Sequence, residues 1–323
     1  MTRVVASAPG KLILFGEYAV LRGGPAIVLA IGRRARVQVT RGVADNLVTA
    51  PEICERNVPF EIDDAGKVRW LGADPAATGR LGLLGEIIGK FWPGVPVYIE
   101  TDTSALHEDG IKMGFGSSAA LTVAASAALS GEKPELGTLI EIHRAAQDGR
   151  GSGFDVAASL HGGVLMFRSE PLETTPLALP PGLHLRCVWT GHAASTSGFL
   201  RGLDALGPRQ SALTALIDSA EKQVMSLGDT AASWVAAVQN FAIDLHNFAC
   251  QTSLPVYAGG HAEVAEIAAR HGVAYKPSGA GGGDLGVAVS ADSAAMDQFT
   301  RDLRAVSLQV FEPGLDPRGL VLE

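Results

Sequence analysis

The sequence predicts an α+β protein of two domains. Its 323 residues are enough for about two domains of roughly 150 residues each. Strand-like and helix-like runs are mixed along the first part of the chain, whereas residues 200–251 are helical. This order favours α+β over a doubly wound parallel sheet, in which strands and helices alternate regularly. Two prolines and a glycine at 180–182 interrupt any regular element, which predicts domains 1–181 and 182–323.

The predicted strands follow from short apolar runs and from alternation. Val37 and Val39 alternate with polar neighbours, which is the period of a half-buried strand. A Pro9-Gly10 turn is expected to separate the first two strands. In chain order, strands are expected at 2–7, 11–15, 36–40, 95–101, 163–167, 183–189 and 285–290, with short strands near the end of the chain.

The predicted helices follow from apolar residues three or four positions apart. Apolar side chains between Leu81 and Phe91 recur at this spacing. A tight glycine turn at 114–118 is expected to open an alanine-rich helix that runs to about Leu129. Further helices are expected at 134–148, from about residue 155, at 200–251, at 260–271 and at 293–305.

Composition excludes some classes of function. Hydrophobic residues make up 47% of the chain and charged residues 19%, which is typical of a soluble protein with a sizeable core. With 26 Lys and Arg against 34 Asp and Glu, the net charge is -8. A general binder of nucleic acid or anionic membranes needs a basic face, so neither partner is expected. A local basic pocket for an anionic substrate remains compatible with this balance.

Targeting signals and metal-binding patterns are not seen in the sequence. The first residues lack the apolar core of a signal peptide, and no apolar run approaches the ~20 residues of a membrane span. Cys54, Cys187 and Cys250 form no CxxC pair, so we expect reduced, buried thiols. The eight histidines form no metal-ligand spacing such as HExxH. We therefore expect a cytoplasmic monomer or homodimer without a bound transition metal.

Three glycine-rich segments carry the expected chemistry, and the first is PGKLILFGEYAV at 9–20. Lys11 directly follows a Pro-Gly pair and begins an apolar strand, so its cation would be held on a rigid element. An exposed lysine on an ordinary strand would give the same local pattern.

The second segment is GFGSSAA at 114–120, at the start of the alanine-rich helix. Small residues let the backbone approach a ligand, and unpaired N–H groups at a helix N-terminus attract phosphate. Ser117 and Ser118 add hydroxyls that can contact phosphate or Mg²⁺. The alternative is an ordinary serine N-cap. The segment matches neither the GxxxxGK[ST] phosphate loop nor the GxGxxG dinucleotide motif.

The third segment is KPSGAGGGD at 276–284. Glycine loses more conformational entropy on ordering than any other residue, so a fixed glycine cluster usually serves close approach of a ligand to the backbone. A flexible linker is the alternative. The strand-like run that follows at 285–290 argues against that interpretation.

A carboxylate lies between the second and third segments, in GSGFDV at 151–156. Asp155 either caps a short helix or acts on a substrate. Phosphoryl transfer needs phosphate-binding amides, a divalent cation, a positive charge near the transferred group and a carboxylate that orients the acceptor. Lys11, Lys112, the glycine segments and Asp155 supply these groups.

The order PGKLILFGEYAVL, GFGSSAA and GAGGGD resembles the three signature motifs of the GHMP kinases, from Pro9 to Asp284. The resemblance implies the fold of that family. Its N-terminal domain is like the second domain of ribosomal protein S5, and its C-terminal domain is ferredoxin-like. ATP with Mg²⁺ would lie in the cleft between them, under the loop at 114–118, and the third motif would close the site.

Four local details resemble the phosphomevalonate kinase branch of this family. The first motif reads GEY at 16–18, where mevalonate kinases and galactokinases usually read GEH. The aspartate segment at 151–156 reads GSGFDV where mevalonate kinases usually read PSGxDN. WTGHAAST at 189–196 resembles a WTGxxAST segment, and the third motif ends as GAGGGD. This resemblance implies phosphomevalonate as the small-molecule acceptor.

The resemblance also implies roles for individual residues. The catalytic group is Asp155, Lys11 and Lys112, and Ser118 is the metal ligand. ATP would contact Gly114, Gly116, Ser117, Ser118, Ala119, Gly279, Gly281 and Gly282. The substrate would contact Lys11, Glu17, Tyr18, Arg150, Ser152, Gly153, His192, Ser195 and Thr196.

One departure from the family concerns the metal. Mevalonate kinases carry a metal-ligating glutamate shortly before the catalytic aspartate, whereas this chain has Gln-Asp-Gly-Arg at 147–150. Asp148 would then substitute, or Ser118 would hold Mg²⁺ mainly with water and phosphate oxygens. Two alternatives in function also stay open: a mevalonate kinase or other GHMP alcohol kinase, and an inactive relative that senses a ligand.

Overall fold

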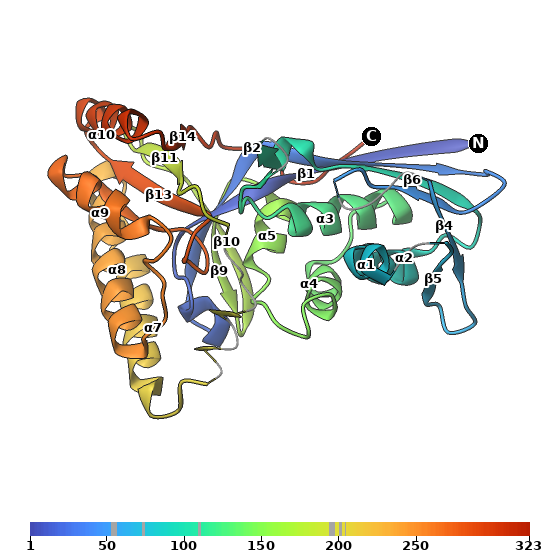
Figure 1. Ribbon diagram of the computed structural model, residues 1–323, viewed down its shortest axis with the longest axis horizontal. Coiled ribbons are helices and arrows are strands. Elements are labelled where there is room, and N and C mark those ends of the chain that lie inside the picture. Colours follow the sequence, from blue (N-terminus) through green and yellow to red (C-terminus); the bar gives the residue numbers. More distant parts are fainter. Residues whose placement is uncertain (53–56, 73–74, 109–110, 194–197, 200–201, 204) are drawn as a thin grey trace.

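The computed structural model covers the whole chain, and its described residues are 1–323 without 53–56, 73–74, 109–110, 194–197, 200–201 and 204. Two sheets organise the described chain, one at each end of an elongated molecule (Figure 1). Every described strand pair is antiparallel except β3 with β6, so the fold is not a doubly wound parallel sheet.

The first sheet contains the strands of the amino-terminal part and the last described strand. Its path is β10-β9-β2-β6-β3-β4-β5, and β1 pairs with both β2 and β15. The strands are β1 (Thr2–Phe15), β2 (Ala26–Arg41), β3 (Leu47–Thr49), β4 (Val58–Ile62), β5 (Val68–Trp70), β6 (Val97–Asp102), β9 (Val164–Ser169), β10 (Leu172–Leu177) and β15 (Val321–Leu322). A separate hairpin pairs β7 (His107–Glu108) with β8 (Ile111–Lys112).

Helices cover one face of this sheet (Figure 1). They are α1 (Pro75–Arg80), α2 (Gly82–Phe91), α3 (Ser117–Ser130), α4 (Leu136–Ala145) and α5 (Phe154–His161), with the 3₁₀ turns η1 (Ala19–Arg22) and η2 (Ser104–Leu106) between strands. The central helix α3 packs on β1, β2, α2 and α5. Its alanines are buried on all sides, which lets these neighbours approach its backbone closely.

The second sheet has the order β12-β13-β11-β14. Its elements are β11 (His184–Trp189), η3 (Gly207–Arg209), α7 (Gln210–Met225), α8 (Ala231–Thr252), α9 (His261–Arg270), β12 (Ala274–Pro277), β13 (Leu285–Ser290), α10 (Ser293–Ala305) and β14 (Gln309–Phe311). Helices α9 and α10 bury one small apolar cluster against the sheet. The helices α7 and α8 join a larger cluster that also contains side chains of β1 and β2.

The shared cluster joins the two ends of the molecule. Phe15 of β1 lies against Phe241 of α8 with ring centroids 5.8 Å apart, and Tyr18 lies 5.1 Å from Phe248. The chain passes from the first sheet to the second between Leu177 and His184, and returns at β15. The division into 1–181 and 182–323 stays a prediction.

The predicted turn at Pro9-Gly10 is wrong, because β1 is one continuous strand. Its pairing with β2 shifts register between Pro9 and Lys11, as in a β-bulge. A Cβ on Gly10 would lie 2.6 Å from the backbone oxygen of Phe115, so only glycine fits here. The bulge lets the Lys11 N–H donate to that same oxygen at 2.8 Å, which ties β1 to the second glycine segment.

Other expectations need smaller corrections. The helix predicted at 134–148 ends at Ala145. Among the described residues of the predicted helical region 200–251, α7 and α8 are separate helices, with a break after Met225. Cys187 is buried as expected, but Cys250 is exposed because it lies on the solvent side of α8. Cys54 lies outside the described residues. Within the described chain, no helix is long and apolar enough to cross a membrane.

Candidate active site

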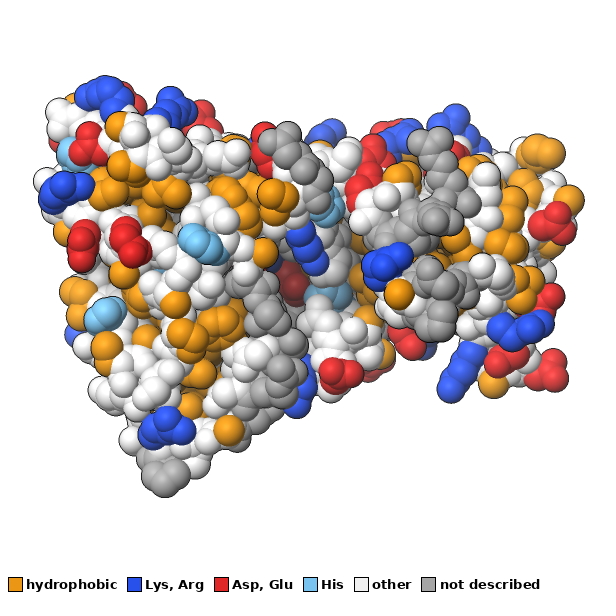
Figure 2. Space-filling view, viewed as in Figure 1, with side chains coloured by type: hydrophobic (Ala, Val, Ile, Leu, Met, Phe, Trp, Pro, Cys, Tyr) orange, Lys and Arg blue, Asp and Glu red, His pale blue; other side chains and the backbone are white. Residues whose placement is uncertain are grey.

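A cavity of about 610 Å³ brings the predicted motifs together. Figure 2 shows a hollow near the middle of the molecule, where charged and histidine side chains gather. The polar and glycine residues that line it include Lys11, Glu17, Tyr18, Lys112, Gly114, Gly116, Ser118, His143, Gln147, Asp148, Arg150, Gly151, Ser152, Asp155, Ser278, Gly279, Gly281, Gly283 and Asp284. The cavity therefore contains parts of the three glycine segments and of the aspartate segment.

The second glycine segment forms the start of α3. Gly114 and Gly116 have φ of 80° and 78°, and Gly116 occupies the N-cap position, directly before the first helical residue Ser117. No described side chain caps the first turn, so Ser117 is not the N-cap that the alternative interpretation required. Helix amides without caps are donors for an anion. Ser118 faces the cavity, whereas Ser117 and Ala119 are buried and are not among its lining residues.

Lys11 lies directly beneath this segment. Its ammonium donates to the Gly114 carbonyl at 3.0 Å and lies 5.7 Å from the centre of the Phe154 ring. Only 8% of the residue is exposed. Burial lowers the pKa of Lys11, and the nearby carboxylates of Asp155 and Asp284 oppose that effect. The ammonium thus lies in the cavity floor beside carboxylates.

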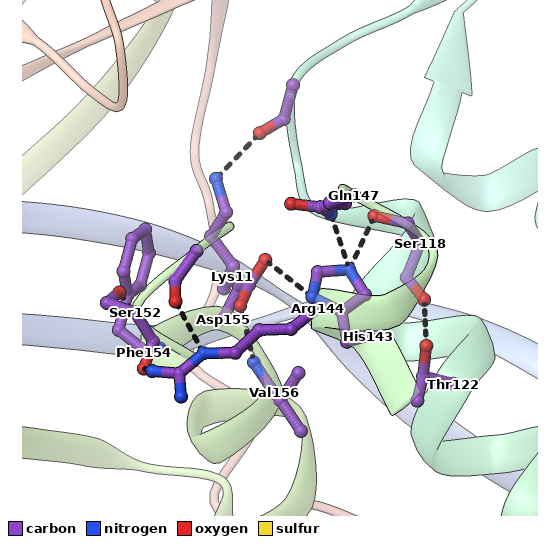
Figure 3. Close-up of polar contacts among 12 residues, drawn as sticks. Lys11, Ser118, Thr122, His143, Arg144, Gln147, Ser152, Phe154, Asp155 and Val156 are labelled. Atoms are coloured by element: carbon purple, nitrogen blue, oxygen red, sulfur yellow. Dashed lines mark hydrogen bonds and ion pairs between the residues drawn. The ribbon is translucent and has the colours of Figure 1, made fainter. Parts of the chain in front are cut away.

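Asp155 is in the first turn of α5, one residue after its start. Gly153, with φ of 93°, occupies the cap position, so Asp155 is not the helix N-cap. One carboxylate oxygen accepts from the Val156 N–H at 2.9 Å, and the other lies 3.9 Å from His143 Nδ1. A carboxylate here is favoured by the positive end of the helix. Figure 3 shows Asp155 between Lys11 and His143.

The third glycine segment is docked on the end of β1. The Ser278 hydroxyl donates to the Ile13 carbonyl at 2.9 Å and accepts from the Ile13 N–H at 3.3 Å. The Tyr18 hydroxyl donates to the Ala280 carbonyl. A Cβ on Gly281 would lie 2.3 Å from the Val256 carbonyl oxygen, so close packing requires glycine there. The segment is thus part of the packed fold, which excludes the flexible linker.

A buried ion pair fixes the beginning of this segment. Glu17, predicted to contact substrate, has one carboxylate oxygen on the ammonium of Lys276. The exposed fractions of the two side chains are 2% and 0%. Burial raises the pKa of Glu17 and lowers that of Lys276, and each charge opposes the shift of the other. The second oxygen of Glu17 has no partner among the described residues.

The segment after Trp189 lies beside the third glycine segment. The Thr190 N–H donates to the Asp284 carbonyl at 3.1 Å, and the Asp284 N–H donates to the His192 carbonyl at 2.6 Å. His192 is not among the residues that line the cavity, and its Nδ1 lies 3.1 Å from the Thr190 carbonyl oxygen. Ser195 and Thr196, predicted as substrate donors, lie outside the described residues.

The remaining residues predicted for the site differ in how deeply they are buried. Lys112 and Arg150 line the cavity; Lys112 is exposed and Arg150 partly buried. Ser152 is buried in the cavity wall, and Gly153 lies behind it as the helix cap. Gly279 lines the cavity, but Gly282 packs against Phe199 instead, with its hypothetical Cβ 2.5 Å from that ring.

Sequence reasoning missed three residues of α4 and the turn after it, and it assigned no role to Lys276. Arg144 donates to the Gly151 and Ser152 carbonyls at 2.7 and 3.2 Å and thereby holds the aspartate segment. His143 contacts both Ser118 and Gln147 (Figure 3). The spacing of four positions between His143 and Gln147, directly before the glycine turn, is the signal that could have placed both on one helix face.

Comparison with known proteins identifies the family of this chain. The model of the GHMP kinases N terminal domain matches residues 81–163. A phosphomevalonate kinase of Streptomyces sp. strain CL190 is 30% identical, with 91% of each chain covered. The chain belongs to the GHMP kinase family.

Further similarities agree with this assignment. A mevalonate kinase of Aeropyrum pernix is 32% identical over 55% of this chain and 53% of its own. The structure of Streptococcus pneumoniae phosphomevalonate kinase in complex with phosphomevalonate and AMPPNP has a TM-score of 0.73 at 18% identity, covering 97% of this chain and 99% of that one. A Listeria innocua protein has a TM-score of 0.84 at 21% identity over 100% and 99%. The predicted α+β class and GHMP kinase fold are confirmed.

Proposed function

We propose that this kinase transfers the terminal phosphoryl group of ATP to phosphomevalonate and forms diphosphomevalonate and ADP. The observation that carries the proposal is the arrangement of Lys11 and Asp155 beneath the uncapped start of α3, inside one cavity. The acceptor class is supported by the Streptomyces phosphomevalonate kinase, which matches along nearly the whole chain.

In this mechanism the amides of the second glycine segment and of the first turn of α3 bind the ATP phosphates. A phosphate oxygen of the acceptor attacks the terminal phosphorus, and the bond to the bridging oxygen of ADP breaks. Lys11 stabilises negative charge on the transferred group. Since the attacking oxygen is already largely anionic at neutral pH, Asp155 mainly orients the acceptor.

The residues at the cavity fit a magnesium ion. The hydroxyl of Ser118 and the carboxylates of Asp155 and Asp284 are oxygen donors on the cavity wall, the ligand type that Mg²⁺ prefers. Ser118 is the residue that we expect to hold the ion, with phosphate and water oxygens completing the shell. When bound, the ion neutralises charge on the ATP phosphates. Asp148, the other candidate ligand, is exposed at the cavity rim.

The acceptor side of the proposal depends on cations at the cavity. Phosphomevalonate carries a phosphate and a carboxylate, and Lys11, Lys112 and Arg150 lie around the space available. Mevalonate carries one anionic group and needs fewer cations. Ser195, Thr196 and His192 stay predictions as substrate contacts, as do the cytoplasmic location and the monomeric or homodimeric state.

A mevalonate kinase is the second candidate, because several mevalonate kinases match about half of this chain at 32–33% identity. The deciding measurement is ADP release with mevalonate, phosphomevalonate and diphosphomevalonate as separate acceptors. We expect turnover with phosphomevalonate. Turnover with mevalonate alone would replace the acceptor and keep the kinase assignment, whereas no turnover with any acceptor would favour a ligand sensor.

A further inference from the structure

We propose that His143 is a positioning residue, which orients the hydroxyl of Ser118 with one ring nitrogen and the carboxylate of Asp155 with the other. The inference rests on the proposed function, because it matters only if nucleotide and a cation bind at the start of α3. His143 belongs to α4 and lies outside the three glycine segments, so none of those motifs assigns it a role. Its effect on the reaction would pass entirely through the two side chains that it faces.

The position of His143 is well defined by its surroundings. The residue is 3% exposed, and its ring lies between the starts of α3 and α5 (Figure 3). Ring atom Nε2 lies 3.1 Å from Ser118 Oγ and 3.0 Å from Gln147 Nε2. Ring atom Nδ1 lies 3.9 Å from Asp155 Oδ2. One imidazole thus faces both the predicted metal ligand and the predicted catalytic carboxylate.

The partners of Nε2 decide where the proton of the neutral ring lies. With the Gln147 amide nitrogen assigned to the side that faces the ring, Nε2 of His143 is the acceptor, because an amide nitrogen only donates hydrogen bonds. The proton of the neutral ring is then on Nδ1 and points toward Asp155. Because Nε2 carries no hydrogen, the Ser118 hydroxyl can only donate to it, and it shares the single lone pair of Nε2 with the Gln147 amide. Gln147 therefore selects the tautomer, and the tautomer selects the direction of the hydroxyl.

This direction suits the role proposed for Ser118. A hydroxyl that donates a hydrogen bond to His143 keeps its oxygen lone pairs for a cation in the cavity. A hydroxyl that accepted a hydrogen bond from the ring would have one of its oxygen lone pairs occupied by that bond. At the other side of the ring, 3.9 Å is too long for a hydrogen bond. The Nδ1–H dipole instead favours a carboxylate that faces it, which keeps Asp155 near the reacting groups.

Three substitutions separate these effects. H143L keeps an apolar side chain of moderate size and removes both ring nitrogens. H143Q places an amide oxygen near the position of Nε2, so Ser118 keeps an acceptor. H143N places its amide near Nδ1, so the Ser118 contact is lost while a polar group still faces Asp155. The contrast between H143Q and H143N is a matched test, because both are neutral amides.

The binding experiment measures the affinity for AMPPNP by calorimetry, with Mg²⁺ and with EDTA. Removing a partner that orients a metal ligand costs roughly 10- to 100-fold in metal affinity or activity. We expect H143L and H143N to reduce the Mg²⁺-dependent gain in affinity by about tenfold or more. Affinity without metal should stay within about twofold, and H143Q should recover most of the gain. In turnover, kcat should fall in the same order while the acceptor KM stays unchanged.

The outcomes separate the inference from the function on which it depends. Equal losses with and without Mg²⁺, or equal behaviour of folded H143Q and H143N, would overturn the role of His143 while wild-type turnover supports the kinase. A wild-type chain that neither binds Mg²⁺-AMPPNP nor releases ADP would overturn both. Thermal unfolding of each variant identifies a loss of folding, and if H143L does not fold, the H143Q and H143N comparison alone decides.

Discussion

Replacing Lys276 by methionine is expected to destabilise the whole protein, since it leaves Glu17 unpaired. Methionine keeps most of the apolar volume of the lysine and removes the charge. The two side chains are 0% and 2% exposed, so water cannot replace the lost partner. Breaking a buried ion pair from one side costs about 3–5 kcal/mol. The variant K276M should therefore lose that much free energy of unfolding in urea at pH 8.

The destabilisation should depend on pH with a defined sign. Burial already raises the pKa of Glu17 above its ordinary value of 4.5, and removing the Lys276 charge raises it further. A carboxyl whose pKa is higher in the folded state loses stability as pH rises through that folded pKa. The difference between K276M and wild type should thus be smallest near pH 4.5 and grow towards pH 8.

The double variant E17Q/K276M is the matched comparison. Since neutral partners need no compensating charge, it should recover most of the stability lost in K276M. Lys133→Met, at an exposed lysine, controls for the loss of one positive charge. A K276M variant within about 1 kcal/mol of wild type at pH 8, or a double variant no more stable than the single one, would refute this account of the pair.

Three further predictions concern catalysis and binding. Asp155→Asn should abolish ADP release in a chain that unfolds like wild type; more than a tenth of the wild-type rate, a difference of only ~1.4 kcal/mol in barrier, would contradict the catalytic role. Gly116→Val should weaken ATP binding more than folding, since its Cβ would lie 2.8 Å from Lys11 Cγ at a φ of 78°; unchanged affinity in a folded variant would exclude the phosphate-binding role. The kcat/KM for phosphomevalonate should exceed that for mevalonate by at least about a hundredfold, because mevalonate lacks the phosphate and loses two charge-assisted hydrogen bonds at about 1.5–3 kcal/mol each. Equal values at one ionic strength would favour the mevalonate kinase branch.

The motifs were predictable because the chemistry is carried by short, local sequence patterns. A glycine segment before an alanine-rich run predicts a helix start, and α3 begins at Ser117, within the predicted turn at 114–118. The strand before the third segment was not predicted, although Ala274–Pro277 forms β12. Its pairing with β13 decides that assignment, and a partner strand is not visible in a local window.

Contacts between distant segments were not predictable for the same reason. Glu17 and Lys276 are adjacent in space only because the third segment packs on the end of β1. The Pro9-Gly10 pair gives a turn signal in sequence, but pairing with β2 on both sides of the bulge outweighs that local preference. His143 lies on a face of α4 whose neighbours, Ser118 and Asp155, come from two other helices.

The antiparallel pairing of β15 with one edge of β1 has a consequence for folding during synthesis. Ala6 pairs with Leu322, and Arg34 holds the segment before β15 through Asp316 and the Gly319 carbonyl. These partners leave the ribosome only after the entire second sheet has been synthesised. Until then, one edge of β1 exposes unsatisfied backbone groups that other chains can pair with. In newly made protein this edge of β1 therefore stays open until the segment with Val321 and Leu322 has been synthesised and has paired with Ser7 and Ala6.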